Sequence, residues 1–191
     1  MNEPPFHATP PVFLPYRAYR PRVHESAFVA PATRLIGDVE VGEESSIWFG
    51  TTIRGDVMPI RIGARTSIQD NSVVHATRGW SATHVGDDCV VGHAVVLHGC
   101  LIGSRVLVGM GCIVMDAARI GDDVILGAGS LVTARTEIPS GSLAMGRPAR
   151  VKRPLTDEER ESIRDGAAHY VEKCREYRAM MAELAEASAS R

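Results

Sequence analysis

The chain has 191 residues and a formal net charge of -2, which suits one domain with a terminal appendage and predicts no strong attraction to nucleic acid or to an anionic membrane. Only 5% of the residues are aromatic, whereas 18 are glycine, a composition that favours a regular, tightly wound backbone over a large aromatic core. We expect neither a signal peptide nor a membrane span, and the four cysteines lack CxxC spacing, so the expected location is the reducing cytoplasm.

The first predicted element is an extended arm. Residues 1–23 contain six prolines, each of which fixes a backbone dihedral and removes a hydrogen-bond donor. We therefore assign 1–23 to an arm outside the regular domain.

Residues 24–150 contain a six-residue repeat. Aliphatic anchors recur every six positions, often followed by glycine, and the residue four places after an anchor is usually small. The anchors are Val41, Ile47, Ile53, Ile62, Ile68, Val74, Val85, Val91, Leu97, Ile102, Val108, Val114, Ile120, Leu126, Val132 and Ile138. A period of six is a multiple of the strand period of two and fits no helix. The pattern predicts an all-β solenoid, a parallel β-helix whose interior holds the anchors and the small residues. Cys89 and Cys112 occupy small positions, so we expect them, and Cys100, to be packing residues.

Residues 151–191 are predicted to be mainly helical. Thr156-Asp157-Glu158-Glu159 is a capping box, in which Thr156 is the N-cap and Glu159 reaches back to it. The helix is expected from about Asp157 to Ala187. Its apolar face should pack along the β-helix or a neighbouring subunit, and consists of Ile163, Ala167, Tyr170, Cys174 and Tyr177.

Three hexapeptides should form one coil with three sides, which Ile62, Ile68 and Val74 head in that order. The repeat is interrupted after Ile53 and after Val74, and both insertions follow a third side, so both loops should leave the same corner.

This register brings histidines into columns. Arg54, His75 and His98 each follow a third-side anchor by one place, so they should stack about 4.8 Å apart, the spacing of paired strands. Asp70 and His93 each follow a second-side anchor by two places and form another column. Two histidines one strand apart can share a metal, and His93 of a neighbouring chain could reach them if the solenoids pack around a threefold axis. Otherwise these are ordinary polar surface residues.

The combination of Arg54-Gly55-Asp56, Gln69-Asp70, His75, and His93 with His98 in "GHxxxLHG" resembles the gamma-class carbonic anhydrases of the hexapeptide-repeat family. The resemblance covers about residues 36–148, with a fainter match in the tail. It implies a left-handed β-helix, a C-terminal helix and a homotrimer that interconverts carbon dioxide and bicarbonate.

The resemblance also implies roles for individual residues. His75 and His98 of one subunit and His93 of the next would hold zinc, for which cobalt or ferrous iron could substitute. Gln69 would orient the water or bicarbonate beside the metal. Arg54 and Asp56 match a pair that bridges the subunit interface, and Asp70 matches a second interface carboxylate, paired with an arginine. Tyr170 matches a tyrosine that lines the site in many bacterial relatives.

The sequence departs from the family pattern at the loop after the first histidine. The archetypal enzyme has a long acidic loop there with a proton-shuttling glutamate, whereas this chain has "ATRGWSAT", with Arg78 near that glutamate's place. Val57 replaces the second acidic residue expected after Arg-Gly-Asp. We therefore expect slow hydration; His84, beside the loop's end, is an alternative proton acceptor.

Two other functions remain open from the sequence. Hexapeptide acyltransferases use one histidine as general base in a cleft between subunits, and His93 or His98 could serve such an acyl-CoA-dependent enzyme without a metal. A metal-stapled trimeric scaffold without activity is the third interpretation.

Overall fold

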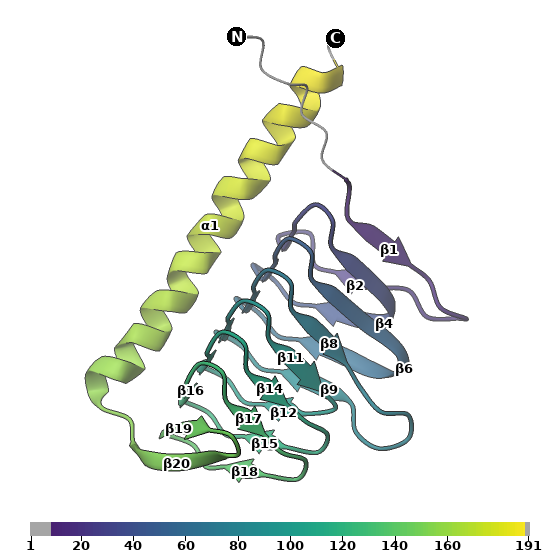
Figure 1. Ribbon diagram of the computed structural model, residues 1–191. Helices are drawn as coiled ribbons and strands as arrows, with labels where there is room; N and C mark the ends of the chain where they lie inside the picture. The colour runs from purple at the N-terminus through teal and green to yellow at the C-terminus, as the bar shows by residue number, and fades with distance from the viewer. Residues whose placement is uncertain (1–8, 190–191) are drawn as a thin grey trace.

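The computed structural model describes residues 9–189 and consists of a three-sided parallel β-helix with one long helix beside it (Figure 1). Successive coils stack through parallel strand pairs, and α1 (Asp157–Ala189) runs back along the stack from the last coils toward the first. The fold class predicted from the six-residue repeat is confirmed.

Each side of the β-helix is a ladder of short strands. Side two is an eight-stranded sheet made of β3 (Phe28–Val29), β5 (Ser46–Ile47), β7 (Ser67–Ile68), β10 (Val90–Val91), β13 (Val106–Val108), β16 (Val124–Leu126), β19 (Ser142–Gly146) and the antiparallel β20 (Ala149–Pro154). Side three contains β1 (Val12–Leu14), the first parts of β4 (Arg34–Val41) and β6 (Thr52–Ile62), β8 (Val73–His75), β11 (Val96–His98), β14 (Ile113–Val114) and β17 (Leu131–Val132). Side one contains β2 (Arg22–Val23), the last parts of β4 and β6, β9 (Thr83–Val85), β12 (Leu101–Ile102), β15 (Arg119–Ile120) and β18 (Glu137–Ile138).

The register of the repeat is the one read from the sequence. Val74 pairs with Ile53 on one side and with Leu97 on the other, as third-side anchors should. Both interruptions lie at the corner between sides three and one: the first inside β6, and the second between β8 and β9. Both loops therefore leave from one corner, as predicted.

The interior is filled by the anchors, most of them fully buried. The small positions have a second role, because their hydroxyl or thiol groups donate to a carbonyl of the next coil. Ser45 Oγ donates to Gly63 O at 2.6 Å, Thr66 Oγ1 to Gly86 O at 2.7 Å, and Cys89 Sγ to Gly103 O at 3.1 Å. Buried polar groups must find such partners. Burial raises the pKa of the Cys89 thiol to about 12, so this cysteine is a packing residue as expected.

One corner of the solenoid carries charges of alternating sign. Glu44, Arg65, Asp88, Arg105 and Asp123 stack there, all with positive φ between 51° and 56°. Arg65 Nε lies 2.6 Å from Asp88 Oδ1, and Arg105 Nε lies 2.9 Å from Asp123 Oδ1. These five residues form a corner ladder with one member from each of five coils, in which the side-chain ion pairs add to backbone hydrogen bonds between the same coils.

The helix α1 begins at the predicted capping box and packs on the first coils. Thr156 N donates to Glu159 Oε2 at 2.9 Å, and Glu159 N donates to Thr156 Oγ1 at 3.2 Å. Its buried face contacts side two and the corner ladder, where Arg175 binds Glu44. The residues of that face that lie in or against a buried cluster with Phe28 and Trp48 are Tyr170, Cys174 and Tyr177. The helix thus packs along the β-helix, one of the two predicted alternatives.

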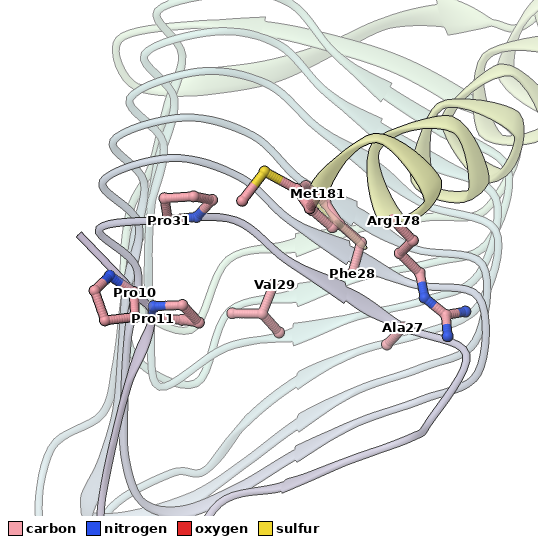
Figure 2. A pocket seen from close by; sticks show the side chains of 8 residues that line it. All are labelled: Pro10, Pro11, Ala27, Phe28, Val29, Pro31, Arg178 and Met181. Atoms are coloured by element: carbon pink, nitrogen blue, oxygen red, sulfur yellow. The ribbon is translucent and has the colours of Figure 1, made fainter. Parts of the chain in front are cut away.

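The predicted arm is described from Thr9 onward, and residues 1–8 lie outside the described residues. Within it, β1 and β2 already pair with β4, so this part of the chain adds strands to the first coil. A hollow of about 390 Å³ lies between the arm, the first coil and α1, where Met181 and Arg178 lie near Phe28 and Ala27 (Figure 2). In residues 9–189, no helix is long and apolar enough to cross a bilayer.

Candidate metal centre split into two halves

The histidine column lies on side three, at the corner that carries the loops. His75 and His98 are direct partners in the pairing of β8 with β11. Their nearest ring nitrogens, His75 Nδ1 and His98 Nε2, are 3.2 Å apart. Two nitrogens bound to one tetrahedral zinc at 2.0–2.1 Å would be separated by about 3.3 Å. Arg54 Nη2 lies 3.5 Å from His75 Nδ1, so the predicted column of three residues is present.

A carboxylate holds the remaining nitrogen of each ring. His75 Nε2 is 3.0 Å from Asp56 Oδ1, and His98 Nδ1 is 3.0 Å from Asp116 Oδ2. An ionised carboxylate can only accept, so in the neutral imidazoles the N–H points at the aspartate and the other nitrogen carries a lone pair. In that tautomer the two lone pairs would face each other at 3.2 Å, which is unfavourable unless a metal cation or a proton lies between them. This donor set fits a divalent metal.

Burial and nearby charges favour a neutral imidazole at His75, and hydrogen bonds favour ionised carboxylates at Asp56 and Asp116. Burial and the Arg54 charge lower the pKa of His75, and they outweigh the opposing effect of Asp56. Burial alone would raise the pKa of Asp56, but hydrogen bonds from Arg54 and His75 leave it lowered. Asp116 behaves likewise, because interactions with Thr77 and His98 more than offset its burial. For His75, Asp56 and Asp116 these shifts favour the protonation states that metal binding requires.

A second half-site lies on side two and contains the other predicted residues. His93 Nδ1 is 2.8 Å from Asp70 Oδ2, and the two stack as predicted. Gln69 is buried and bonds the Tyr170 side chain from α1; burial and the charge of Asp70 raise the pKa of Tyr170 despite that bond. His93 is the most exposed of the three histidines, with 48% of its side chain accessible.

The two halves do not meet within the chain. Among residues 9–189, no three His, Cys, Asp or Glu side chains surround a common metal position. His75 and His98 form one group with Arg54 and Asp56, and His93 belongs to the other with Gln69, Asp70 and Tyr170. Within this chain, Arg54 Nη1 binds Asp56 Oδ2 at 2.5 Å, and Asp70 binds His93, whereas the resemblance gave both carboxylates interface partners.

The loop beside the column is short, and contacts with the solenoid fix its position. Thr83 Oγ1 donates to His75 O at 2.5 Å, and the Arg135 guanidinium lies 5.3 Å from the centre of the Trp80 ring. Arg78 is exposed. His84 pairs with Arg61 and Leu101 on side one, so it belongs to another face of the solenoid than His75.

Sequence reasoning missed Asp116. It considered the residue one place after each third-side anchor, which in this coil is Met115, whereas Asp116 stands two places after Val114. The feature of the sequence that could have indicated Asp116 is the glycine at position 99, directly after His98. In the structure Gly99 has a φ of +60°, and a Cβ there would lie 2.3 Å from Asp116 Oδ1. A glycine beside a candidate ligand histidine marks a place where another group approaches closely.

Comparison with known proteins shows which family the chain belongs to. Residues 99–134 match the family model "Bacterial transferase hexapeptide (six repeats)". A carbonic anhydrase from Geobacillus kaustophilus is 43% identical over 169 residues, which cover 88% of this chain and 92% of that protein. The chain belongs to the gamma carbonic anhydrase family. Its β-helix is accordingly of the left-handed, hexapeptide-repeat class, and membership implies a metal cofactor.

Other similar proteins differ from this chain in length, description or degree of likeness. Gamma carbonic anhydrase 1 of Arabidopsis thaliana mitochondria is 43% identical over 155 residues, which cover 78% of this chain but only 56% of that protein. A hexapeptide transferase family protein from Anaplasma phagocytophilum is 43% identical with a TM-score of 0.84, covering 87% of this chain and 98% of that one. An acetyltransferase from Vibrio cholerae solved with acetyl coenzyme A is 23% identical, a likeness that shows the fold alone.

Proposed function

We propose that this protein is a metal-dependent carbonic anhydrase that interconverts carbon dioxide and bicarbonate. The observation that carries the proposal is the 3.2 Å separation of His75 Nδ1 and His98 Nε2, each ring held from behind by an aspartate. An acyltransferase base needs one histidine near a thioester, and nothing in that chemistry calls for two facing imidazole lone pairs.

We further propose that a homotrimer joins the two half-sites. His93 of one subunit would complete the pair formed by His75 and His98 of the next. Support comes from two apolar surfaces of the same chain. The outer face of side three presents the column Val73, Val96, Ile113 and Leu131. Side two carries a groove of about 400 Å³ beside His93, lined by apolar residues such as Leu107, Met110 and Ile125. Packing the column of one copy into the groove of the next is a heterologous contact, which closes into a ring when the rotation is threefold.

In this assembly the chain's own residues would bind the metal, orient the substrate and pair their charges across the interface. His75, His93 and His98 would bind the metal, with zinc the best match to three imidazoles and cobalt or ferrous iron as substitutes. When bound, the metal supplies Lewis acidity that makes hydroxide available near neutral pH. Gln69, fixed by its bond to Tyr170, would present its amide to the substrate oxygens. Arg54 and Asp56 would move from their bond within one chain to one that spans the interface.

Proton release is the step that we expect to limit the rate of hydration. The proton that each hydration produces must leave the site before the next turnover, and a group with a pKa near the working pH transfers it best. The segment 76–83 contains no carboxylate, and Arg78 cannot accept a proton at neutral pH. Hydration should therefore be slow in weak buffer.

We place the protein in the cytoplasm, since all four cysteines are free and buried.

The experiment is elemental analysis of protein purified without a chelator or a metal-binding tag, combined with a carbon dioxide hydration assay. We expect about one divalent metal per chain and measurable hydration in imidazole buffer. His98→Ala should lose both, whereas His84→Ala, a histidine on side one, should keep the metal. Wild-type protein that holds far less than one-third of a metal per chain, even after zinc is added, would overturn the proposal.

A further inference from the structure

The contact between Asp116 and His98 differs from the other two histidine–carboxylate contacts. Asp116 follows β14 and lies one coil beyond His98; its side chain is 9% exposed. The side chain of Asp56 is 17% exposed and that of Asp70 31%, and both belong to the surfaces that would meet in a trimer. Asp116 is the carboxylate whose bond to a histidine is already buried within one chain.

The backbone around Asp116 makes room for this bond. Gly99, directly after His98, has no side chain, and a Cβ there would collide with Asp116 Oδ1 at 2.3 Å. Oδ1 is fully buried and accepts no hydrogen bond of good geometry from any residue between 9 and 189. Burying a carboxylate with one oxygen unpaired is unfavourable, and two side chains offset that cost: Thr77, whose interaction lowers the pKa of Asp116, and His98, whose Nδ1 lies 3.0 Å from Oδ2. Of these two partners, His98 is the one that belongs to the candidate metal centre.

We propose that Asp116 is the positioning residue of the metal centre, an inference that rests on the proposed function. By accepting the proton of His98 Nδ1, Asp116 fixes the tautomer in which Nε2 carries the lone pair, and it fixes the plane of the ring. Nε2 then faces His75 Nδ1 before any metal arrives. Asp116 does not touch the metal or the substrate; it acts through His98.

The test compares Asp116→Ala and Asp116→Asn with the wild type by two readouts. The first is the tautomer of His98 in the metal-free protein, read from its ring ¹⁵N shifts at alkaline pH, where imidazole is neutral, and assigned with His98→Gln. The second is zinc affinity in competition with a chromophoric chelator. Glu137→Ala, which removes an exposed carboxylate from side one, is the control for charge and folding.

We expect the wild type to show the Nδ1–H tautomer, and Asp116→Ala to lose it and to bind zinc roughly 10- to 100-fold more weakly. Asp116→Asn keeps an acceptor oxygen, so it should retain more of the tautomer and lose less affinity. If Asp116→Asn folds and Asp116→Ala does not, the comparison of Asn with wild type carries the test.

An unchanged tautomer in Asp116→Ala overturns the inference, whether or not zinc affinity falls, because any loss would then come from packing. A wild type that binds no zinc refutes the proposed function instead. In that event the tautomer readout alone decides the role of Asp116, so the two failures are distinguishable.

Discussion

Replacing Gly99 with alanine should break the bond between Asp116 and His98, although neither of these two residues is substituted. The new Cβ would lie 2.3 Å from Asp116 Oδ1 and 3.2 Å from the backbone oxygen of Ser81. Separations below 3.0 Å force a neighbour to move, and the carboxylate is the group that can. Asp116 should rotate away from His98.

Two contributions set the size of the effect. The left-handed backbone of an alanine at φ +60° costs roughly 1–2 kcal/mol. A hydrogen bond to a charged group contributes about 1.5–3 kcal/mol. Gly99→Ala should therefore lower the free energy of unfolding by about 2.5–5 kcal/mol. The next two residues in this corner, Ala117 and Arg135, have φ of 58° and 60°, so the backbone alone does not demand glycine.

The assay is urea unfolding at one fixed protein concentration, because assembly links stability to concentration. In the Asp116→Ala background the clash is gone, and Gly99→Ala should cost only the roughly 1–2 kcal/mol of backbone strain. The coupling between the two substitutions should thus be about 1.5–3 kcal/mol. Ala117→Gly, the matched control in the same corner, should change stability little, since relief of strain is offset by the entropy of glycine. An equal cost of Gly99→Ala in both backgrounds would refute the clash with Asp116.

Three further outcomes are expected. Arg105 lowers the pKa of Asp123 through their hydrogen bond, so the pair stabilises the fold above the ordinary carboxyl pKa of about 3.9, and this contribution is lost as the pH falls through the lowered value. The difference in melting temperature between wild type and Arg105→Ala should therefore shrink from about pH 7 to about pH 3. A difference that stays constant over this range would contradict the prediction. Thr156→Ala should destabilise the protein by about 1 kcal/mol in urea unfolding through loss of the N-cap, with Thr156→Ser restoring most of it; an unchanged midpoint in the alanine variant would show that the cap contributes nothing. Imidazole buffer at constant ionic strength should raise the hydration turnover number, and Arg78→Glu should raise it in weak buffer; a zinc-loaded protein indifferent to both would not be limited by proton release.

The parts of the site that follow from the repeat could be predicted. His75 and His98 stand one place after third-side anchors, and the six-residue period fixes that register whatever the loops between them do. His93 and Asp70 follow by the same rule on side two. The capping box of α1 is equally local, because its two hydrogen bonds join residues three positions apart.

The parts that depend on side-chain direction could not be predicted. Asp116 is one place out of the His98 column, and only the left-handed corner and the missing side chain of Gly99 let its carboxylate reach the ring. The contact of Trp80 with Arg135 joins an irregular loop to a corner, which no period describes. The repeat likewise predicts that His75 and His98 share one column and that Asp70 and His93 share another, but it carries no information on how two chains would bring the proposed half-sites together.

The most direct test of the split metal centre is subunit complementation. His75→Ala removes a ligand from one half-site and His93→Ala removes the ligand of the other, so neither variant alone should bind much zinc. If the proposed trimer forms, refolding the two variants together would give some interfaces with an intact His75 and His98 on one chain and an intact His93 on its neighbour. Zinc content should rise well above that of either variant alone in trimers shown by mass spectrometry to be mixed. If the mixed trimers bind no more zinc than the separate variants, the ligands do not come from two chains and the account is wrong.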